Sequence, residues 1–102
     1  MGRFRYGKPD DNQGEIVKVY RASGWQVTIT SQMGHGFPDL ILSKLCDSVL
    51  AEVKVKKGKI RDSQKYFCRT WQGKPIALIR SKEEAIKHIQ TGEYTKLVDV
   101  IK

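Results

Sequence analysis

A chain of 102 residues is long enough for one modest hydrophobic core and too short for two. Its content of 39% hydrophobic and 29% charged residues is typical of a folded globular domain and argues against general disorder. Nineteen Lys and Arg side chains against eleven Asp and Glu give a formal net charge of +8, which favours a polyanionic partner, most often nucleic acid. A charge that serves only solubility is the alternative.

The two cysteines and the lengths of the apolar runs indicate the cellular compartment of the protein. Cys46 and Cys68 are too few and too far apart for a zinc site or a disulfide framework, so we expect free thiols in a reducing compartment. No apolar run approaches the roughly 18 to 20 residues of a membrane span, and the first residues resemble neither a signal peptide nor a myristoylation signal. We therefore expect a cytoplasmic protein (nuclear if the host has a nucleus) without a membrane partner.

The first ten residues predict an irregular basic arm. Arg3, Arg5 and Lys8 alternate with aromatic residues and glycine, and Pro9-Asp10 ends the segment. Such an arm can lie along a phosphate backbone, but a frayed terminus has the same composition.

A helix is predicted from about residue 11 to 23. Its apolar residues recur at the three-and-four spacing of one helix face, and Gly24 is a natural stop. Glu15 lies at the edge of the apolar stripe. The pattern alone favours a solvated first-turn glutamate over a carboxylate directed at a site.

Three strands are predicted next, over residues 25–30, 38–43 and 49–56. The first two are separated by a polar, glycine-containing loop over 31–36, and the last two by a turn over 44–47. His35 in the loop is a tempting catalytic base, but a lone loop histidine is more often incidental.

The rest of the chain predicts a helix over 60–71, a buried strand over 75–80, a helix from Ser81 to about Gln90, and a tail over 97–101 that could be a last strand. The order helix, three strands, helix, strand, helix predicts an α/β fold with helices packed on a central mixed sheet. We expect a single domain over residues 1–102.

Three charged side chains converge in this arrangement. Because side chains alternate along a strand, Glu52 and Lys54 project to the same face. A hairpin symmetric about Leu45 and Cys46 puts Asp39 directly opposite Glu52, with Cβ atoms roughly 4.5 to 5.5 Å apart. A slip of one residue would put the two carboxylates on opposite faces.

Two carboxylates and a lysine at one point can support phosphodiester hydrolysis. Oxygen ligands without histidine or cysteine favour Mg²⁺ or Mn²⁺ over zinc. Such an ion polarises a phosphate and lowers the pKa of a bound water, while a lysine orients that water or stabilises developing charge. A strand with a solvated charged face has the same Glu-x-Lys pattern, but Pro-Asp on the preceding strand and the net charge favour the metal site.

These residues also resemble a known family. Gly36-Phe37-Pro38-Asp39-Leu40 followed by Glu52-Val53-Lys54 is similar to the motif of the PD-(D/E)xK nuclease superfamily, closest to stand-alone VRR-NUC domains of phage and bacterial type, with archaeal-type Holliday-junction resolvases next. Gln64 falls where the family has a glutamine at the start of a helix, and Glu15 where it has a glutamate on the first helix. The resemblance covers roughly residues 12 to 80 and implies a restriction-endonuclease-like core.

The resemblance implies a role for each site residue. Asp39 and Glu52 would bind Mg²⁺, or Mn²⁺ as a substitute, with the Val53 carbonyl as a third ligand. Lys54 would act on the nucleophilic water. Glu15 would help to bind the metal ion, and Gln64 would support the site. The resemblance also implies a homodimer that acts on branched DNA, such as Holliday junctions or flaps, in DNA repair.

A cluster of basic residues after the third strand predicts a phosphate-binding surface: Lys56, Lys57, Lys59, Arg61, Lys65 and Arg69. Arg3 and Arg5 of the N-terminal arm are expected to join it. Phosphate contacts neither read sequence nor distinguish DNA from RNA. The leading prediction is a structure-selective, Mg²⁺-dependent endodeoxyribonuclease. A non-catalytic nucleic-acid-binding module on the same fold and an RNA-directed nuclease are the alternatives.

Overall fold

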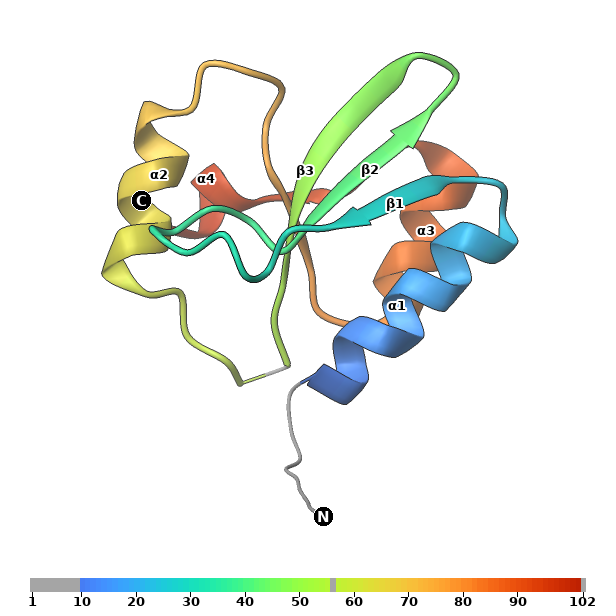
Figure 1. The fold of residues 1–102 in the computed structure, drawn as a ribbon, viewed down its shortest axis with the longest axis horizontal. Helices are drawn as coiled ribbons and strands as arrows, with labels where there is room; N and C mark the ends of the chain where they lie inside the picture. The colour runs from blue at the N-terminus through green and yellow to red at the C-terminus, as the bar shows by residue number, and fades with distance from the viewer. Residues whose placement is uncertain (1–9, 56, 102) are drawn as a thin grey trace.

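The computed structural model describes residues 10–55 and 57–101. Arg3, Arg5 and Lys56, three of the predicted nucleic-acid contacts, therefore lie outside the described residues. The described chain is a small α/β domain, as predicted, in which a five-stranded mixed sheet separates two pairs of helices (Figure 1). The elements in chain order are α1 (Asp10–Ala22), β1 (Gln26–Ile29), β2 (Leu40–Lys44), β3 (Asp47–Val53), α2 (Asp62–Thr70), β4 (Ala77–Ile79), α3 (Lys82–Thr91), β5 (Thr95–Lys96) and α4 (Leu97–Ile101).

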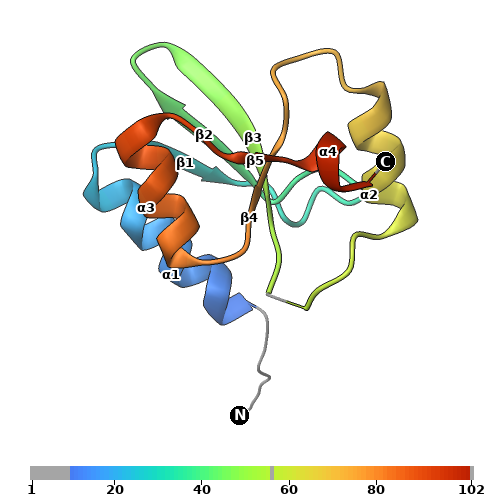
Figure 2. The same cartoon turned by 180° about the vertical axis from the view of Figure 1, so that it is seen from behind.

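The strands lie in the order β1-β2-β3-β4-β5. Neighbours are antiparallel except β3 and β4, which run parallel because α2 crosses between them. Figure 2 shows β4 and β5 from behind, with α1 and α3 to one side and α2 and α4 to the other. The sheet is therefore three antiparallel strands joined to a parallel crossover unit.

The alternation of side chains along β3 divides the core into two layers. Val49 and Ala51 face the layer that α1 and α3 cover. Leu50 faces the opposite layer, where Cys68 of α2 and Ile101 of α4 pack. Glu52, two residues beyond Leu50, consequently projects toward α2.

The predicted hairpin register is confirmed. Leu40 pairs with Ala51, and Lys44 pairs with Asp47, so that paired residue numbers sum to 91 as expected. The two turn residues between the strands, Leu45 and Cys46, both have positive φ, at 54° and 66°. This is the backbone of a tight hairpin turn whose twist matches that of the strands, and it leaves no freedom for a one-residue slip.

The C-terminal tail differs from the expected last strand. The sheet ends instead with the two-residue β5, and residues from Leu97 onward form the helix α4. Leu97 and Ile101 are both buried in the layer that contains α2. Residues four apart share a face in a strand and in a helix alike, so the apolar pattern did not distinguish the two structures.

The predicted helix from Ser81 to about Gln90 is confirmed as α3, for which Ser81 is the N-cap. The Ser81 hydroxyl accepts a hydrogen bond from the Glu84 N–H at 3.1 Å, and Gly92 ends the helix at φ 79°. The longest of the described helices, α1, has 13 residues. Over residues 10–55 and 57–101, no helix combines the length and the apolar composition needed to cross a bilayer.

Candidate active site at the ends of β2 and β3

A pocket of about 370 Å³ lies beyond the ends of β2 and β3, and we call it the carboxylate pocket. It brings together the four predicted catalytic residues: Asp39 just before β2, Glu52 and Lys54 at the end of β3, and Gln64 on α2. The lining consists of Gln13, Ser31, Asp39, Glu52, Val53, Lys54, Val55, Gly58, Arg61 and Gln64.

Asp39 is held at the pocket by the backbone of β3. Extending the register of the hairpin by one residue puts Asp39 opposite Glu52. The Asp39 Oδ2 atom accepts a hydrogen bond from the Val53 N–H at 2.9 Å. Since the N–H and C=O of one strand residue point to the same side, the Val53 carbonyl is also directed toward Asp39. This direction fits the predicted role of that carbonyl as a ligand.

Glu52 is the most enclosed charged residue in the pocket, with 1% of its surface exposed. Its Oε2 atom accepts a 2.6 Å hydrogen bond from the Gln64 amide and lies 3.8 Å from the Lys54 ammonium nitrogen. Its Oε1 atom is fully buried and, when Glu52 is ionised, has no hydrogen-bond partner. Burial, and next the adjoining charge of Asp39, raise the pKa of Glu52 to about 8. Without a cation, this carboxyl group is therefore protonated at neutral pH.

Gln64 connects Glu52 to the first turn of α2. The side-chain carbonyl of Gln64 accepts a hydrogen bond from the Arg61 N–H at 2.8 Å, while its NH₂ group donates to Glu52. Both ends of this buried amide are thereby satisfied. The predicted place of Gln64, in the opening turn of the second helix, is confirmed, and the contact fixes the orientation of Glu52.

Lys54 continues β3 into the pocket, and 14% of its side chain is exposed. Its N–H donates to the Ile79 carbonyl at 3.2 Å, so β4 holds the backbone in place. The Asn12 amide of α1 donates to the carbonyls of Lys54, at 3.3 Å, and Arg80, at 3.2 Å. No local sequence signal indicates this contact between residues 42 positions apart.

Gly36 explains how the loop before Asp39 reaches α2. Its φ is 81°, and a Cβ atom at this position would overlap the backbone carbonyl of Ser63. Only glycine combines this conformation with so close an approach. The loop that ends at Asp39 is therefore seated on the turn that carries Gln64, which couples the two sides of the pocket.

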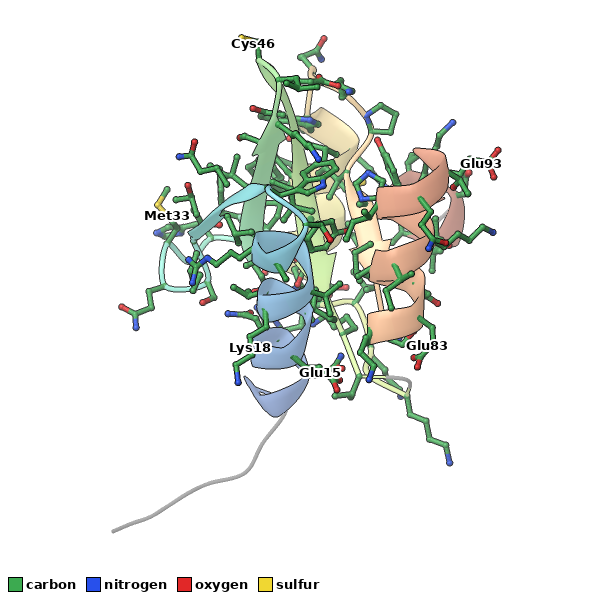
Figure 3. All side chains as sticks on the ribbon, turned by 90° about the vertical axis from the view of Figure 1, so that its right-hand side faces the viewer. Glu15, Lys18, Met33, Cys46, Glu83 and Glu93 are labelled. Carbon is green, nitrogen blue, oxygen red and sulfur yellow. The ribbon has the colours of Figure 1, made fainter. Side chains whose placement is uncertain are left out.

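Glu15 is the predicted site residue that the fold does not bring to the pocket. Its side chain is 52% exposed and forms an ion pair with Lys82 at 3.7 Å, at the end of α1 that faces the start of α3 (Figure 3). Gln13 lines the pocket instead. Residues two apart on a helix point about 200° away from each other, so only one of this pair can face the pocket. The first helix thus contributes an amide where a carboxylate was expected.

The described basic residues lie around the pocket and along α2. Arg61 lines the pocket and is exposed. Lys57 and Lys59 are exposed on the segment that follows β3. On α2, Lys65 is half-buried, and Arg69 is exposed with its guanidinium 3.4 Å from the Ile101 carbonyl. His35, considered as a base, is exposed in the β1–β2 loop with φ at 56° and is not among the lining residues.

The donor atoms of the pocket fit a small divalent cation. Two carboxylates face each other, and the buried Glu52 Oε1 atom lacks the partner that an ion would supply. Among the described residues, no three His, Cys, Asp or Glu side chains gather in a metal-binding group. Such a site would rely on Asp39 and Glu52, completed by a backbone carbonyl and water, as Mg²⁺ readily accepts.

Comparison of the chain with protein families, with curated proteins and with solved structures gave no match. The chemistry of the carboxylate pocket is therefore the basis for a function.

Proposed function

We propose that this protein is a metal-dependent endonuclease that hydrolyses DNA phosphodiester bonds on a restriction-endonuclease-like core. The observation that carries the proposal is the pair of opposed carboxylates in which a buried oxygen, Glu52 Oε1, has no partner. An ammonium group, that of Lys54, lies 3.8 Å from the same carboxylate. A buried polar atom without a partner costs folding free energy, and a bound cation would recover that cost.

In this proposal Asp39 and Glu52 would hold Mg²⁺, for which Mn²⁺ could substitute. The ion would supply Lewis-acid polarisation of the scissile phosphate and a water of lowered pKa. Lys54 orients the attacking water and stabilises charge that develops on the phosphate. Gln64 keeps the Glu52 carboxylate in position through the 2.6 Å hydrogen bond.

Binding of the ion must displace a proton. Because the pKa of Glu52 is raised to about 8, its carboxyl group carries a proton at neutral pH when no cation is present. The carboxylate form is the ligand, so affinity for the ion should rise with pH up to that value.

The basic residues beside the pocket suit a DNA backbone. Arg61 borders the site, and Lys57 and Lys59 extend from it on the loop after β3. Contacts of this kind give affinity that decreases steeply with salt and carries no sequence information. We infer selection of branched DNA by shape, by a homodimer that presents two such surfaces.

The deciding experiment compares purified protein on a labelled four-way junction, a flap, a linear duplex and a single-stranded RNA. We expect cleavage of branched DNA with Mg²⁺ or Mn²⁺ and none with EDTA. The matched control is Asp39→Asn, which removes one charge without changing shape and should reduce the cleavage rate by at least about 1,000-fold. Junction binding by the variant should persist.

Three results would contradict the proposal. Binding without cleavage of any substrate would indicate a nucleic-acid-binding module, and cleavage confined to RNA would indicate an RNA-directed nuclease. Cutting by Asp39→Asn at the rate of the unmodified protein would show that the chemistry lies elsewhere. Light scattering tests the dimer separately, since a monomer at working concentrations would exclude symmetric cleavage.

A further inference from the structure

A second cavity, which we call the aromatic cavity, opens on the other face of the sheet. It has a volume of about 190 Å³ and lies near the hairpin turn, between the end of α3 and the strands β2 and β3. Leu42 and Val49 form its apolar floor, and both belong to the layer that α1 and α3 cover. Glu52 projects to the opposite face, so the aromatic cavity is separate from the carboxylate pocket.

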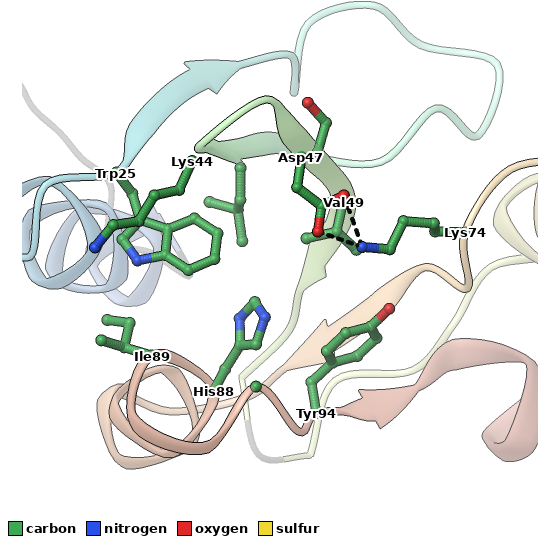
Figure 4. A pocket seen from close by; sticks show the side chains of 11 residues that line it. Trp25, Lys44, Asp47, Val49, Lys74, His88, Ile89 and Tyr94 are labelled. Carbon is green, nitrogen blue, oxygen red and sulfur yellow. Dashed lines mark hydrogen bonds and ion pairs between the residues drawn. The ribbon is translucent and has the colours of Figure 1, made fainter.

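Three rings form the walls of the cavity. His88 lies between Trp25 and Tyr94 (Figure 4), with ring centroids 5.2 Å from Trp25 and 5.0 Å from Tyr94. The Tyr94 hydroxyl donates to the Pro75 carbonyl at 2.7 Å, which fixes that ring. Aromatic contacts of this geometry are favourable, so the walls keep their positions without a ligand.

His88 contributes a hydrogen-bond donor to the cavity. Its Nδ1 atom lies 2.7 Å from the hydroxyl of the fully buried Tyr20. Burial raises the pKa of Tyr20 and lowers that of His88, so both groups are neutral. When the Tyr20 hydroxyl donates to Nδ1, the proton of the imidazole ring is on Nε2. The Nε2 atom of His88 has no hydrogen-bond partner among the described residues. It is not fully buried, since Glu52 Oε1 is the one fully buried polar side-chain atom without a partner in the described chain. Because His88 lines the cavity, Nε2 is open to it.

Two lysines stand at the rim. Figure 4 shows Lys44 on the side of Trp25 and Lys74 on the side of Tyr94. The ammonium group of Lys44 donates to the Ser23 carbonyl at 3.0 Å, and that of Lys74 bonds both oxygens of Asp47, at 2.7 and 2.8 Å. The Lys74–Asp47 pair is exposed to water, so its rearrangement around an incoming anion is cheap.

We propose that the aromatic cavity binds the base of a pyrimidine nucleotide, with the phosphate held by Lys44 or Lys74. A cavity of about 150 Å³ holds a benzene molecule, and sites for drug-sized ligands begin near 300 Å³, so this volume suits one six-membered ring. Trp25 and Tyr94 supply stacking faces. The Nε2–H of His88 donates to a ring carbonyl, which every pyrimidine base carries.

The choice of a nucleotide as the ligand rests on the proposed function. The geometry of the cavity is independent of that function. The same chemistry is offered by a free nucleoside monophosphate and by an unpaired nucleotide at a branch or end of a DNA strand. Free thymidine monophosphate and a hairpin with one unpaired thymine distinguish these sources. Equal affinity indicates the free nucleotide, and tighter hairpin binding indicates the strand.

The test is an NMR titration of Asp39→Asn protein in EDTA, so that neither metal nor cleavage is involved. Thymidine monophosphate should shift the Trp25 indole N–H and the Gly92 amide in a saturable way. Adenosine monophosphate and phosphate-free thymidine should bind more weakly. Lys74→Glu should weaken binding by roughly tenfold or more, whereas Lys87→Glu, an exposed charge reversal away from the cavity, should leave it unchanged.

The same titration can overturn the proposal. Absence of saturable shifts up to millimolar nucleotide, or shifts confined to the carboxylate pocket, would exclude the site. Trp25→Leu should also weaken binding by roughly tenfold. If that variant is unfolded by circular dichroism, the preference for thymidine over adenosine monophosphate decides, because a surface that binds only phosphate would show none. A protein that binds thymidine monophosphate here but cuts no DNA would retain this site and lose the nuclease proposal.

Discussion

The carboxylate pocket and the aromatic cavity differ in whether the buried polar groups beside them have hydrogen-bond partners. Behind the aromatic cavity, the buried Tyr20 hydroxyl is paired with the Nδ1 atom of His88. In the carboxylate pocket, Glu52 lies beside a second carboxylate, that of Asp39, and one of its oxygen atoms has no hydrogen-bond partner. The first arrangement stabilises the fold, whereas the second costs stability and is relieved by an added cation.

This difference predicts opposite responses to conservative substitutions. At a pH where Glu52 is ionised, a neutral replacement in the carboxylate pocket removes charge repulsion and desolvation, so it should stabilise the metal-free protein while eliminating activity. Removal of the Tyr20 hydroxyl behind the aromatic cavity leaves the buried His88 Nδ1 atom unpaired, so it should destabilise the protein while activity persists. Stability and activity measured on the same variants separate the two regions.

The largest effect is expected from Glu52→Gln. In the folded protein Glu52 binds a proton up to about pH 8, whereas in the unfolded chain the proton dissociates near the ordinary value of 4.5. The folded state therefore holds more protons across this window, and the free energy of unfolding falls as pH rises through it. Between about pH 5 and about pH 8.5 the loss should be on the order of 3 to 5 kcal/mol, and Glu52→Gln should not show it.

Urea unfolding in EDTA at both pH values measures this loss. Glu83→Gln is the matched control, since it removes an exposed carboxylate on α3 and should keep the pH dependence. Mg²⁺ should restore stability to the unmodified protein at high pH and not to Glu52→Gln. A stability that is flat with pH in the unmodified protein would show that Glu52 is ionised in the empty pocket.

Tyr20→Phe should lower the free energy of unfolding by about 1 to 2 kcal/mol, because it leaves the Nδ1 atom of His88 without its donor. Thermal unfolding with circular dichroism measures the effect. Tyr94→Phe is the control, since its hydrogen bond is exposed to water and its loss should cost less. DNA cleavage should be unchanged in both variants, and a large loss of cleavage in either would link the two regions.

The hairpin could be predicted from the sequence because side chains alternate along a strand with a period of two, which leaves little choice of register. Once Leu45 and Cys46 form the turn, every pair across β2 and β3 follows, including the position of Asp39 opposite Glu52. The helix α4 could not be predicted in the same way. Leu97 and Ile101 share a face in either structure, and their packing against α2 decided between them.

The contribution of α1 to the pocket was also beyond sequence reasoning. A helix pattern shows which side is apolar, but the polar residues at its border differ in direction by 100° per step. Whether Gln13 or Glu15 faces the pocket depends on how α1 is rotated against α3, and buried Ile16 and Tyr20 set that rotation. The bond from Asn12 to β3 and β4 depends on the same rotation.

This rotation makes Gln13→Glu informative. The substitution adds a third carboxylate to the lining of the pocket, and we expect the affinity for Mg²⁺ to rise about tenfold, since added ligand charge strengthens binding of hard cations. Isothermal titration calorimetry at pH 8 or above measures the affinity directly. The metal-free variant should be less stable than the unmodified protein, because three carboxylates then repel one another. An unchanged affinity would show that Gln13 lies too far from the ion to coordinate it.

The smallest effect is expected from Glu15→Gln, which tests the role that the family resemblance implied. Glu15 is half exposed and pairs only with Lys82 in the described structure, so the substitution should cost less than about 1 kcal/mol of stability. Affinity for Mg²⁺ and the rate of cleavage should match those of the unmodified protein. Lys82→Gln removes the other partner of the ion pair and should behave identically. A tenfold loss of metal affinity in Glu15→Gln alone would mean that α1 turns when the ion binds and exchanges Gln13 for Glu15, so the pair of variants measures the orientation of the first helix in the loaded protein.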